Sequence, residues 1–168
     1  MTIRRRIAFS LVELSVVLLI LAIAAGAIVL RVSGPMHRAQ MNDAVDQVRS
    51  FDTLTRQIAR QQGRPIQTVF HVGSGRISRT DSTGREGVGS VIELPGDFVI
   101  SRLAIDGRTL GSGQAAVGFS SQGFSGSYAV RISGPSGQER WLLLAGLSGQ
   151  PTELGNETEV DAYFAALR

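Results

Sequence analysis

Glu13 is the residue whose type and position most clearly demand a chemical explanation. It is the only charged residue between Phe9 and Leu30, and from Leu14 to Leu30 the only polar residue is Ser15. A carboxylate at the edge of an apolar span is costly unless a cation meets it. Cleavage before Phe9 would supply one, because the new α-amino group would lie four residues from Glu13, on the same chain or on a neighbour. The alternative is that Glu13 extends toward water at a membrane surface.

The apolar run around Glu13 is long enough to cross a bilayer as an α-helix. About 20 residues, at a rise of about 1.5 Å each, span a hydrocarbon core ~30 Å thick. We therefore expect residues 9–33 to form a transmembrane and assembly helix. Three arginines, Arg4 to Arg6, precede it, and the next basic residue is Arg31. This asymmetry predicts a single pass with the N-terminus in the cytoplasm and the rest of the chain exported.

The stretch Phe9-Ser10-Leu11-Val12-Glu13-Leu14, with basic residues before it and an apolar helix after it, resembles the processing signal of type IV pilins and type II secretion pseudopilins. The resemblance implies that prepilin peptidase cuts between Ala8 and Phe9, removing residues 1–8 as a leader peptide, and that the new amine of Phe9 is methylated. It also implies that Glu13 docks each subunit against the next. The family usually has glycine where this chain has Ala8. Since alanine is the next smallest residue, we expect processing to persist at a lower rate.

An ordinary secretory signal peptide is a second interpretation of the same stretch. Arg4 to Arg6 would be its basic region, Leu14–Leu21 its apolar region and Ala22-Ile23-Ala24 its cleavage site. The product would be a soluble protein that begins at Ala25. The charge of Glu13 beside the apolar region, and the apolar helix that continues past it, disfavour this interpretation.

Composition narrows the possible chemistry. The 168 residues include 17 arginines, no lysine and 14 acidic residues, so removal of a leader with three arginines leaves fourteen charges of each sign. The chain has no cysteine, which excludes disulfides and thiolate metal sites, and its two histidines, His37 and His71, have no partner at ligand spacing. The carboxylates are scattered, and no nucleophile or phosphate-binding motif occurs. We therefore expect no enzyme activity, no metal and no cofactor.

Nucleic acid is not an expected partner. From Gly63 onward nine arginines accompany ten acidic residues, without aromatic residues interleaved among the basic ones. Arg76, Arg79 and Arg85 would form at most a local basic patch. A solvated hairpin face is the expected use of these three residues.

Residues 34–62 are predicted to continue the N-terminal helix in amphipathic form. Gly34-Pro35 predicts a kink or a short break, because proline removes a backbone donor and restricts the residue before it. Helical spacing resumes from Met36 to about Gln62. The apolar face is expected to carry Met41, Val45, Val48, Phe51 or Asp52, Thr55 and Ile58, and to be widened by Ala44, Leu54 and Ala59. The polar surface is expected to carry Asn42, Asp43, Asp46, Arg49, Asp52, Arg56 and Arg60.

From Ile66 onward the hydrophobic period changes to two, with turn residues every eight to twelve positions. Residues 63–168 are therefore expected to form a β-rich globular domain. The expected strands are Ile66–Val72, Arg76–Thr80, Val88–Leu94, Phe98–Ile105, Ala115–Ser120, Ser127–Ser133 and Arg140–Ala145. The last two flank a turn of glycine, proline and serine and should form a central antiparallel hairpin.

The C-terminal tail leaves two possibilities open. Val160, Tyr163, Phe164 and Leu167 recur at helical spacing after the acidic segment Glu153–Asp161. They form either a short helix that docks on the sheet or a frayed end. The expected fold class is α+β, in which a long N-terminal transmembrane and amphipathic α-helix packs on a C-terminal antiparallel, sandwich-like β-sheet head.

This plan resembles the pilin fold and, within it, the H-class minor pseudopilins of type II secretion. The segments that carry the resemblance are Val117–Gly123, Tyr128–Ile132 and Trp141–Gly149. Gln150 departs from the pattern, because that family commonly has a basic residue there. The resemblance implies a structural, non-enzymatic subunit. Its implied partners are other pseudopilin subunits, prepilin peptidase and an inner-membrane assembly platform.

We therefore expect a minor pseudopilin of a type II secretion pseudopilus, which assists protein export across the outer membrane. Its expected location is the bacterial inner membrane, which it crosses once with its C-terminal domain in the periplasm, before it enters the pseudopilus. Two alternatives remain. One is a minor type IV pilin of a pilus or DNA-uptake machine, and the other is an exported soluble protein cut at an ordinary signal-peptidase site.

Overall fold

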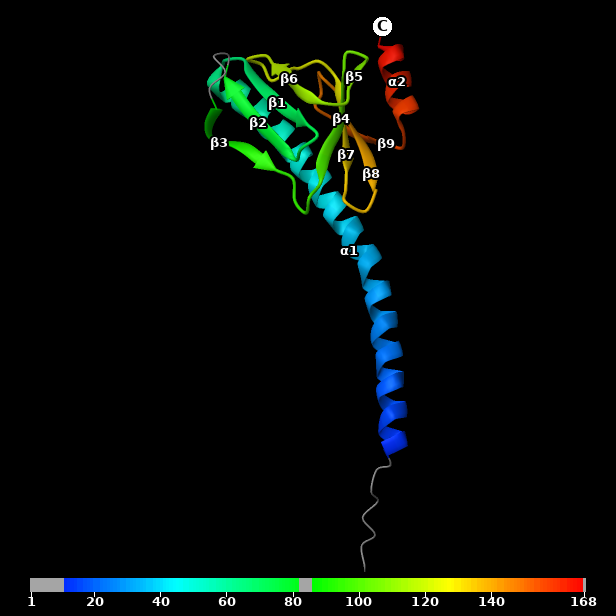
Figure 1. The fold of residues 1–168 in the computed structure, drawn as a ribbon. Coiled ribbons are helices and arrows are strands. Elements are labelled where there is room, and N and C mark those ends of the chain that lie inside the picture. The colour runs from blue at the N-terminus through cyan, green and yellow to red at the C-terminus, as the bar shows by residue number, and fades with distance from the viewer. Residues whose placement is uncertain (1–10, 82–85, 168) are drawn as a thin grey trace, which may run out of the picture. The chain divides into compact units, whose positions relative to one another are not determined.

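A computed structural model describes the backbone of residues 11–81 and 86–167 (Figure 1). It also describes the side chains of these residues, except those of residues 25–37 and 86–90. The described chain begins with a long helix, continues through nine strands and ends with a short helix. The α+β fold class expected from the change of hydrophobic period is therefore confirmed.

The first element, α1 (Leu11–Gln62), is one helix that extends from the first compact unit of the chain, Met1–Ala39, into the second, Gln40–Arg168. It continues through Gly34 and Pro35, so the short break expected there does not occur. Proline removes one intrahelical donor, and this loss alone does not end a helix whose sequence favours helix on both sides. The second unit is called the head below.

Two antiparallel sheets form most of the head, next to the C-terminal part of α1 (Figure 1). The first sheet has the strand order β3-β2-β1-β6 and the second the order β5-β4-β7-β8-β9. The strands are β1 (Ile66–Val72), β2 (Arg76–Asp81), β3 (Glu86–Glu93), β4 (Val99–Ile105), β5 (Arg108–Leu110), β6 (Gly113–Phe119), β7 (Tyr128–Ser133), β8 (Glu139–Leu144) and β9 (Pro151–Leu154). The seven strands predicted from the sequence are confirmed with ends that differ by at most two residues, whereas β5 and β9 were not predicted.

The hairpin of β7 and β8 is central, as expected. Its register pairs Tyr128 with Leu144 and Ser133 with Glu139, and β4 and β9 flank it in the sheet. All residues of β8 from Trp141 to Leu144 are buried. A strand that is buried on both faces needs a cover on each side of its sheet.

The main core supplies the first cover, because it joins α1 to both sheets. Met41, Val45 and Val48 of α1 belong to one buried cluster with Phe70 of β1 and Leu142 of β8. Each fully buried side chain of this kind stabilises the fold by roughly 1.5–3 kcal/mol. The apolar face of α1 predicted from helical spacing is thus the face that packs on the sheets. The prediction was wrong for Leu54, which is 51% exposed and lies outside the buried cluster.

The second cover is the C-terminal helix α2 (Glu157–Ala166), which lies on the five-stranded sheet (Figure 1). Val160 and Phe164 of α2 form a separate buried cluster with Trp141 and Leu143 of β8. Alternate residues of β8 therefore serve the two cores. Of the two possibilities left open for the tail, a docked helix is the one that forms.

Two leucines of opposite environment test this core. Leu142 is fully buried, whereas Leu147 is 79% exposed. We expect Leu142→Ala to lower the free energy of unfolding by about 2–5 kcal/mol, because it leaves a cavity. Leu147→Ala should change it by less than about 0.5 kcal/mol. Urea unfolding of the full chain in detergent measures both, and equal losses would contradict the assigned core.

Candidate assembly site

The first unit presents an apolar helix whose side chains are exposed. Every residue from Leu11 to Ala24 is exposed, and a helix that is apolar all round is typical of a segment buried in a larger assembly. The large exposed side chains are Leu11, Val12, Leu14, Val16, Val17, Leu18, Leu19, Ile20, Leu21 and Ile23. The predicted cleavage residues Ala8 and Phe9 lie outside the described residues. Within the described part of the chain, no helix is both long enough and apolar enough to span a membrane.

Glu13 lies in the first turn of α1, and its side chain is exposed. It forms no ion pair with any residue that the structure describes. The hydroxyl of Ser15 donates to the carbonyl oxygen of Leu11 at 2.8 Å. Glu13 is therefore the polar side chain of residues 11–24 that is available to an external partner.

The head contains two buried charges on α1. Asp52 is 2% exposed and Arg56 is 5% exposed. Arg56 Nε donates to Asp52 Oδ2 at 2.7 Å, and Tyr128 Oη donates to Asp52 Oδ1 at 2.7 Å. The predicted polar surface was wrong for Asp52 and Arg56. Four and eight positions after Val48, they fall on the side of the helix that packs on the sheets.

Each of the five N–H donors of Arg56 has an acceptor inside the head. One acceptor is Asp52, and the others belong to the β6–β7 and β8–β9 loops. Those acceptors are Gly123 O at 3.1 Å, Gly146 O at 2.7 Å, Ala145 O at 3.4 Å and Ser125 Oγ at 2.9 Å. The guanidinium carbon also lies 5.1 Å from the ring centroid of Phe119. One side chain of α1 thus holds two loops, and full hydrogen bonding offsets the cost of burying its charge.

The same two loops approach each other and Arg56 so closely that three glycines leave no room for a side chain. A Cβ on Gly123 would lie 2.8 Å from the carbonyl oxygen of Arg56. A Cβ on Gly146 would lie 2.2 Å from the carbonyl oxygen of Ser125, and a Cβ on Gly149 would lie 2.9 Å from Arg56 Nε. Gly149 also has a φ of +70°, which favours glycine. Glycine is therefore what allows the loop backbone to reach the guanidinium.

Tyr128 completes the buried cluster. Burial raises the pKa of the Tyr128 hydroxyl well above its usual range. The negative charge of Asp52 and the hydrogen bond to it raise this pKa further, while the nearby charge of Arg56 opposes the shift. The hydroxyl therefore stays protonated and donates to the carboxylate.

Arg79 is buried too, and the solvated hairpin face expected for it was wrong. Its Nε donates to Thr55 Oγ1 at 2.9 Å, and its guanidinium carbon lies 4.4 Å from the ring centroid of Phe51. Burial lowers the pKa of Arg79. Arg79 therefore contributes to the contact between β2 and α1 and adds nothing to a surface patch with Arg76. Arg85 lies outside the described residues.

Two carboxylates of the acidic tail form contacts with other residues of the head. Glu157 forms an ion pair with Arg102 of β4. Glu159 accepts hydrogen bonds from the backbone nitrogen of Gly155 at 2.8 Å and from Asn156 Nδ2 at 3.0 Å. These contacts stabilise the start of α2. In the part of the chain that the structure describes, no group of three or more His, Asp or Glu side chains is placed to hold a metal ion.

Comparison of the fold with solved structures gives a match, although no protein-family model and no curated protein sequence matches the chain. The match is a crystal structure of the type IV minor pilin FimU from Pseudomonas aeruginosa. Its TM-score is 0.50 at 12% sequence identity, and the aligned region covers 71% of this chain and 91% of that chain. The fold is pilin-like. At this identity the likeness concerns the fold alone.

Two parts of this pilin-like fold carry the candidate chemistry. The exposed apolar helix around Glu13 can bind another apolar surface together with a cation. The network around Arg56 is closed, because its donors are satisfied inside the head. Among the described residues, these groups are therefore suited to binding and mechanical support.

Arg56 and Arg49 provide a matched comparison on the same helix. Arg49 forms partly exposed pairs with Asp46 and Glu153, whereas Arg56 pairs with the buried Asp52. Arg56→Met leaves a buried carboxylate without its cation, so the free energy of unfolding should fall by about 3–5 kcal/mol. Arg49→Met should lower it by about 0–1 kcal/mol. Urea unfolding of the full chain in detergent compares the variants, and a small loss for Arg56→Met would show that the network does not support the head.

Alkaline pH tests the protonated state of Tyr128. Its pKa in the folded state is raised, so between the unfolded value of about 10 and the folded value the native protein holds a proton that the unfolded chain loses. Stability should therefore fall as pH rises past about 10, by up to ~1.4 kcal/mol per pH unit from this group. Tyr128→Phe should flatten this slope, and Tyr163→Phe serves as the control that keeps it. Unfolding free energies at pH 9 to 11 measure the effect, and an unchanged slope in Tyr128→Phe would contradict it.

Proposed function

We propose that the chain is a structural subunit of a type IV pilin-like filament, namely a minor pseudopilin of a type II secretion pseudopilus. The observation that carries this proposal is the exposed apolar helix of residues 11–24, whose one available polar group is Glu13. The pilin-like fold supports it. In this role the subunit assists protein export across the outer membrane and performs no chemical step.

The proposed mechanism follows from what covers the apolar helix at each stage. Lipid of the bacterial inner membrane covers it first, in a single pass with the N-terminus in the cytoplasm and the head in the periplasm. Prepilin peptidase then cuts between Ala8 and Phe9, and the amine of Phe9 is methylated. During assembly on the inner-membrane platform, neighbouring pseudopilin helices replace lipid, and Glu13 meets the Phe9 amine of a neighbour. This ion pair compensates a charge that would otherwise be costly in an apolar core.

A minor type IV pilin of a pilus or DNA-uptake machine is a second candidate, favoured by the fold likeness to FimU. Deletion of the chain from its host separates the two roles. A pseudopilus subunit is required for release of secreted proteins, whereas a pilus subunit is required for surface pili, and retention of DNA by the protein at moderate salt would favour uptake. The third candidate, a soluble protein cut after Ala24, is disfavoured because α1 is helical on both sides of that bond.

The N-terminus of the mature protein tests the proposal directly. Intact mass and N-terminal sequencing of the chain from membranes of its host should give a methylated Phe9 as the first residue. In the same preparation Glu13→Ala should be processed normally, since Glu13 is five residues beyond the cut. Its yield in the sheared filament fraction should fall about tenfold or more, which corresponds to a loss of ~1.4 kcal/mol of pairing energy.

Ser15→Ala is the matched control, because it removes the other polar side chain of residues 11–24 without removing the charge. It should enter filaments as the unchanged chain does. A mature start at Ala25 would overturn the proposed function. Equal incorporation of Glu13→Ala and Ser15→Ala would overturn the role of Glu13.

A further inference from the structure

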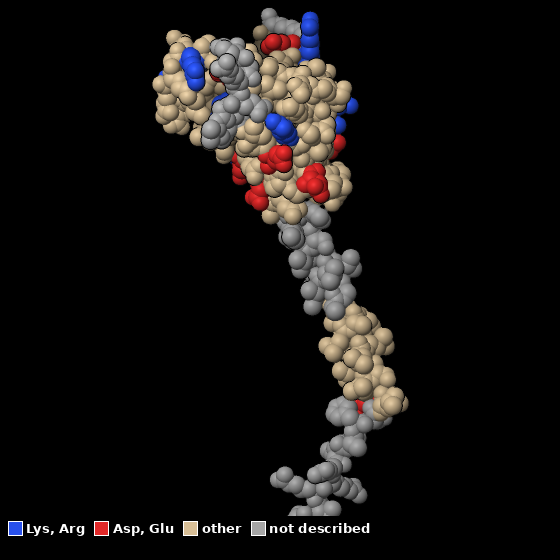
Figure 2. All heavy atoms as spheres, turned by 60° about the vertical axis from the view of Figure 1, so that its left-hand side comes forward, with Lys and Arg blue, Asp and Glu red and all other residues tan. Residues whose placement is uncertain are grey.

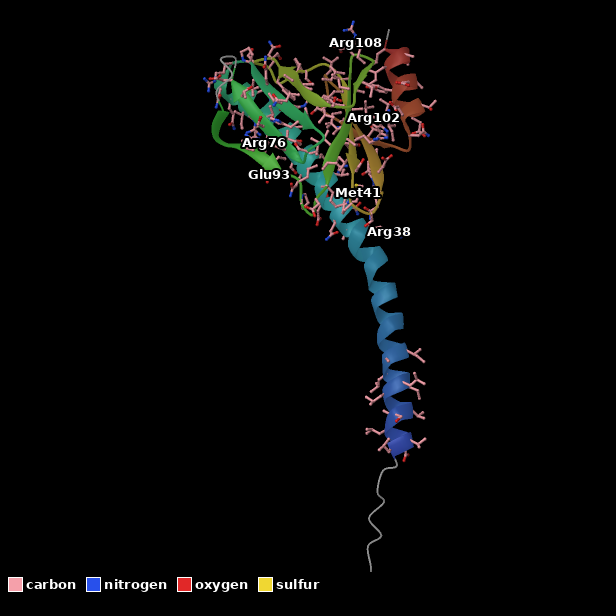
Figure 3. The ribbon with its side chains drawn as sticks, in the orientation of Figure 1. Arg38, Met41, Arg76, Glu93, Arg102 and Arg108 are labelled. Atoms are coloured by element: carbon pink, nitrogen blue, oxygen red, sulfur yellow. The ribbon has the colours of Figure 1, made fainter. Side chains whose placement is uncertain are left out.

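The head carries an apolar groove with an acidic rim, here called the acidic groove. Its volume is 460 Å³, and Leu54 of α1 within it is 51% exposed. Asp43 at the rim is exposed and forms no ion pair with any described residue. The other lining residues are Asp46, Gln47, Ser50, Phe51, Ile92 and Pro95. Figure 2 shows acidic side chains gathered on the lower part of the head, and Figure 3 places Glu93, the next residue after Ile92, near that end.

A second exposed surface, here called the loop knob, consists of Phe124, Leu147 and Arg60. Phe124 is 45% exposed and Leu147 is 79% exposed, although both are large and apolar. Arg60 lies beside the first loop, because a Cβ on Gly123 would be 3.2 Å from Arg60 Cγ. Arg60 is exposed and has no ion pair among the described residues. The knob therefore presents apolar side chains with an unpaired cation, the complement of the acidic groove.

Buried contacts hold the loop knob in shape. The backbone nitrogen of Ser125 donates to Gly146 O at 3.1 Å, which joins the two loops one residue away from Phe124 and Leu147. Arg56 binds acceptors in both loops. A surface ordered before binding loses less conformational entropy when it binds. Such order in exposed apolar loops indicates a surface prepared for a partner.

The knob and the groove lie on different sides of α1, so they do not meet within one chain. Leu54 lines the groove and Arg56 holds the knob, and two residues along an α-helix correspond to a rotation of about 200°. Asp43 and Arg60 are seventeen positions apart, or about 25 Å along the helix axis. Contact between two different surfaces of identical chains is heterologous, and when it does not close into a ring it builds an open helix.

We propose that the loop knob of one copy inserts into the acidic groove of a second copy, with Arg60 facing Asp43. This rests on the proposed filament function and names a contact through which successive heads join. Opposite charges, exposed apolar side chains on both surfaces and the rotation and rise between them all favour a second copy as the occupant. With three side chains in the knob, we expect the contact to bury less than the roughly 1,000 Å² of a stable interface. It therefore needs copies concentrated by the membrane or the filament.

Cysteine crosslinking between copies tests this contact, because the chain has no cysteine of its own. Full-length Leu54→Cys and full-length Leu147→Cys, carrying different tags, are expressed together in the host and oxidised in membranes and in sheared filaments. We expect a disulfide-linked dimer that carries both tags. Thr109→Cys, at an exposed site on β5, replaces Leu147→Cys as the control and should yield at least about fivefold less.

Charge reversal tests the same contact without relying on one pair of thiols. Asp43→Arg or Arg60→Asp alone, introduced into both tagged chains, should lower the yield of mixed dimer several-fold. The double reversal should restore most of the yield, because the opposite charges face each other again. Both positions are exposed, so loss of fold is not expected to explain the singles.

The outcomes separate this contact from the proposed function. Chains that enter filaments but give no excess of mixed dimer over the Thr109→Cys control overturn the contact. A disulfide between identical tags only, or no rescue by the double reversal, also overturns it. Chains that never enter the filament fraction overturn the proposed function instead.

Discussion

The guanidinium of Arg56 is the constraint on which the architecture of the head depends. A cation buried to this degree is tolerated when its donors are satisfied and its charge is paired, and the structure meets both conditions. The acceptors come from α1 and from two loops that end different strands. The helix and the loops therefore cannot move independently without leaving a charge unpaired in the core. Because replacing such a network with apolar residues is often neutral or stabilising, its value lies in fixing one arrangement of helix and loops.

The arrangement of the rest of the head follows from the need to cover each apolar face of the sheets. Strand β8 is buried on both sides, so α1 covers one face of its sheet and α2 the other. Leu142 and Leu144 serve the first contact, and Trp141 and Leu143 serve the second. Without a disulfide, this head relies on packing and on the few polar contacts between its layers. The pairing of Glu157 with Arg102 is one such contact, because it joins α2 to β4.

Much of this fold was predictable because period-two patterns and turn residues are local signals. The strands β5 and β9 were not predicted because they are short, with three and four residues, and have no buried position. The burial of Asp52 and Arg56 was not predicted for a different reason. Because aspartate and arginine are charged, both residues were expected on the solvent-exposed side of the helix. Helical spacing also allowed Asp52 to lie on the apolar face. The loop acceptors of Arg56 lie 67 to 90 positions away from it in the sequence, and Tyr128, which donates to Asp52, lies 76 positions from that carboxylate. Periodicity carries no information on such distant contacts. A polar residue at a position where helical spacing predicts an apolar one is therefore the sign of a buried polar network that the local sequence offers.

The exposed helix and the head contribute different things to recognition. A helix that is apolar all round gains little by exchanging lipid for another apolar helix, since both environments are equally apolar. Residues 11–24 can therefore bind many surfaces without choosing among them. Choice requires groups whose mispairing is costly, such as a charge that must meet its opposite. Glu13 is the candidate for that role in the helix, and Asp43 and Arg60 are candidates in the head. In the proposed filament, the apolar helix would therefore add little preference of its own, and a few charged side chains would determine which neighbour is accepted and in which register.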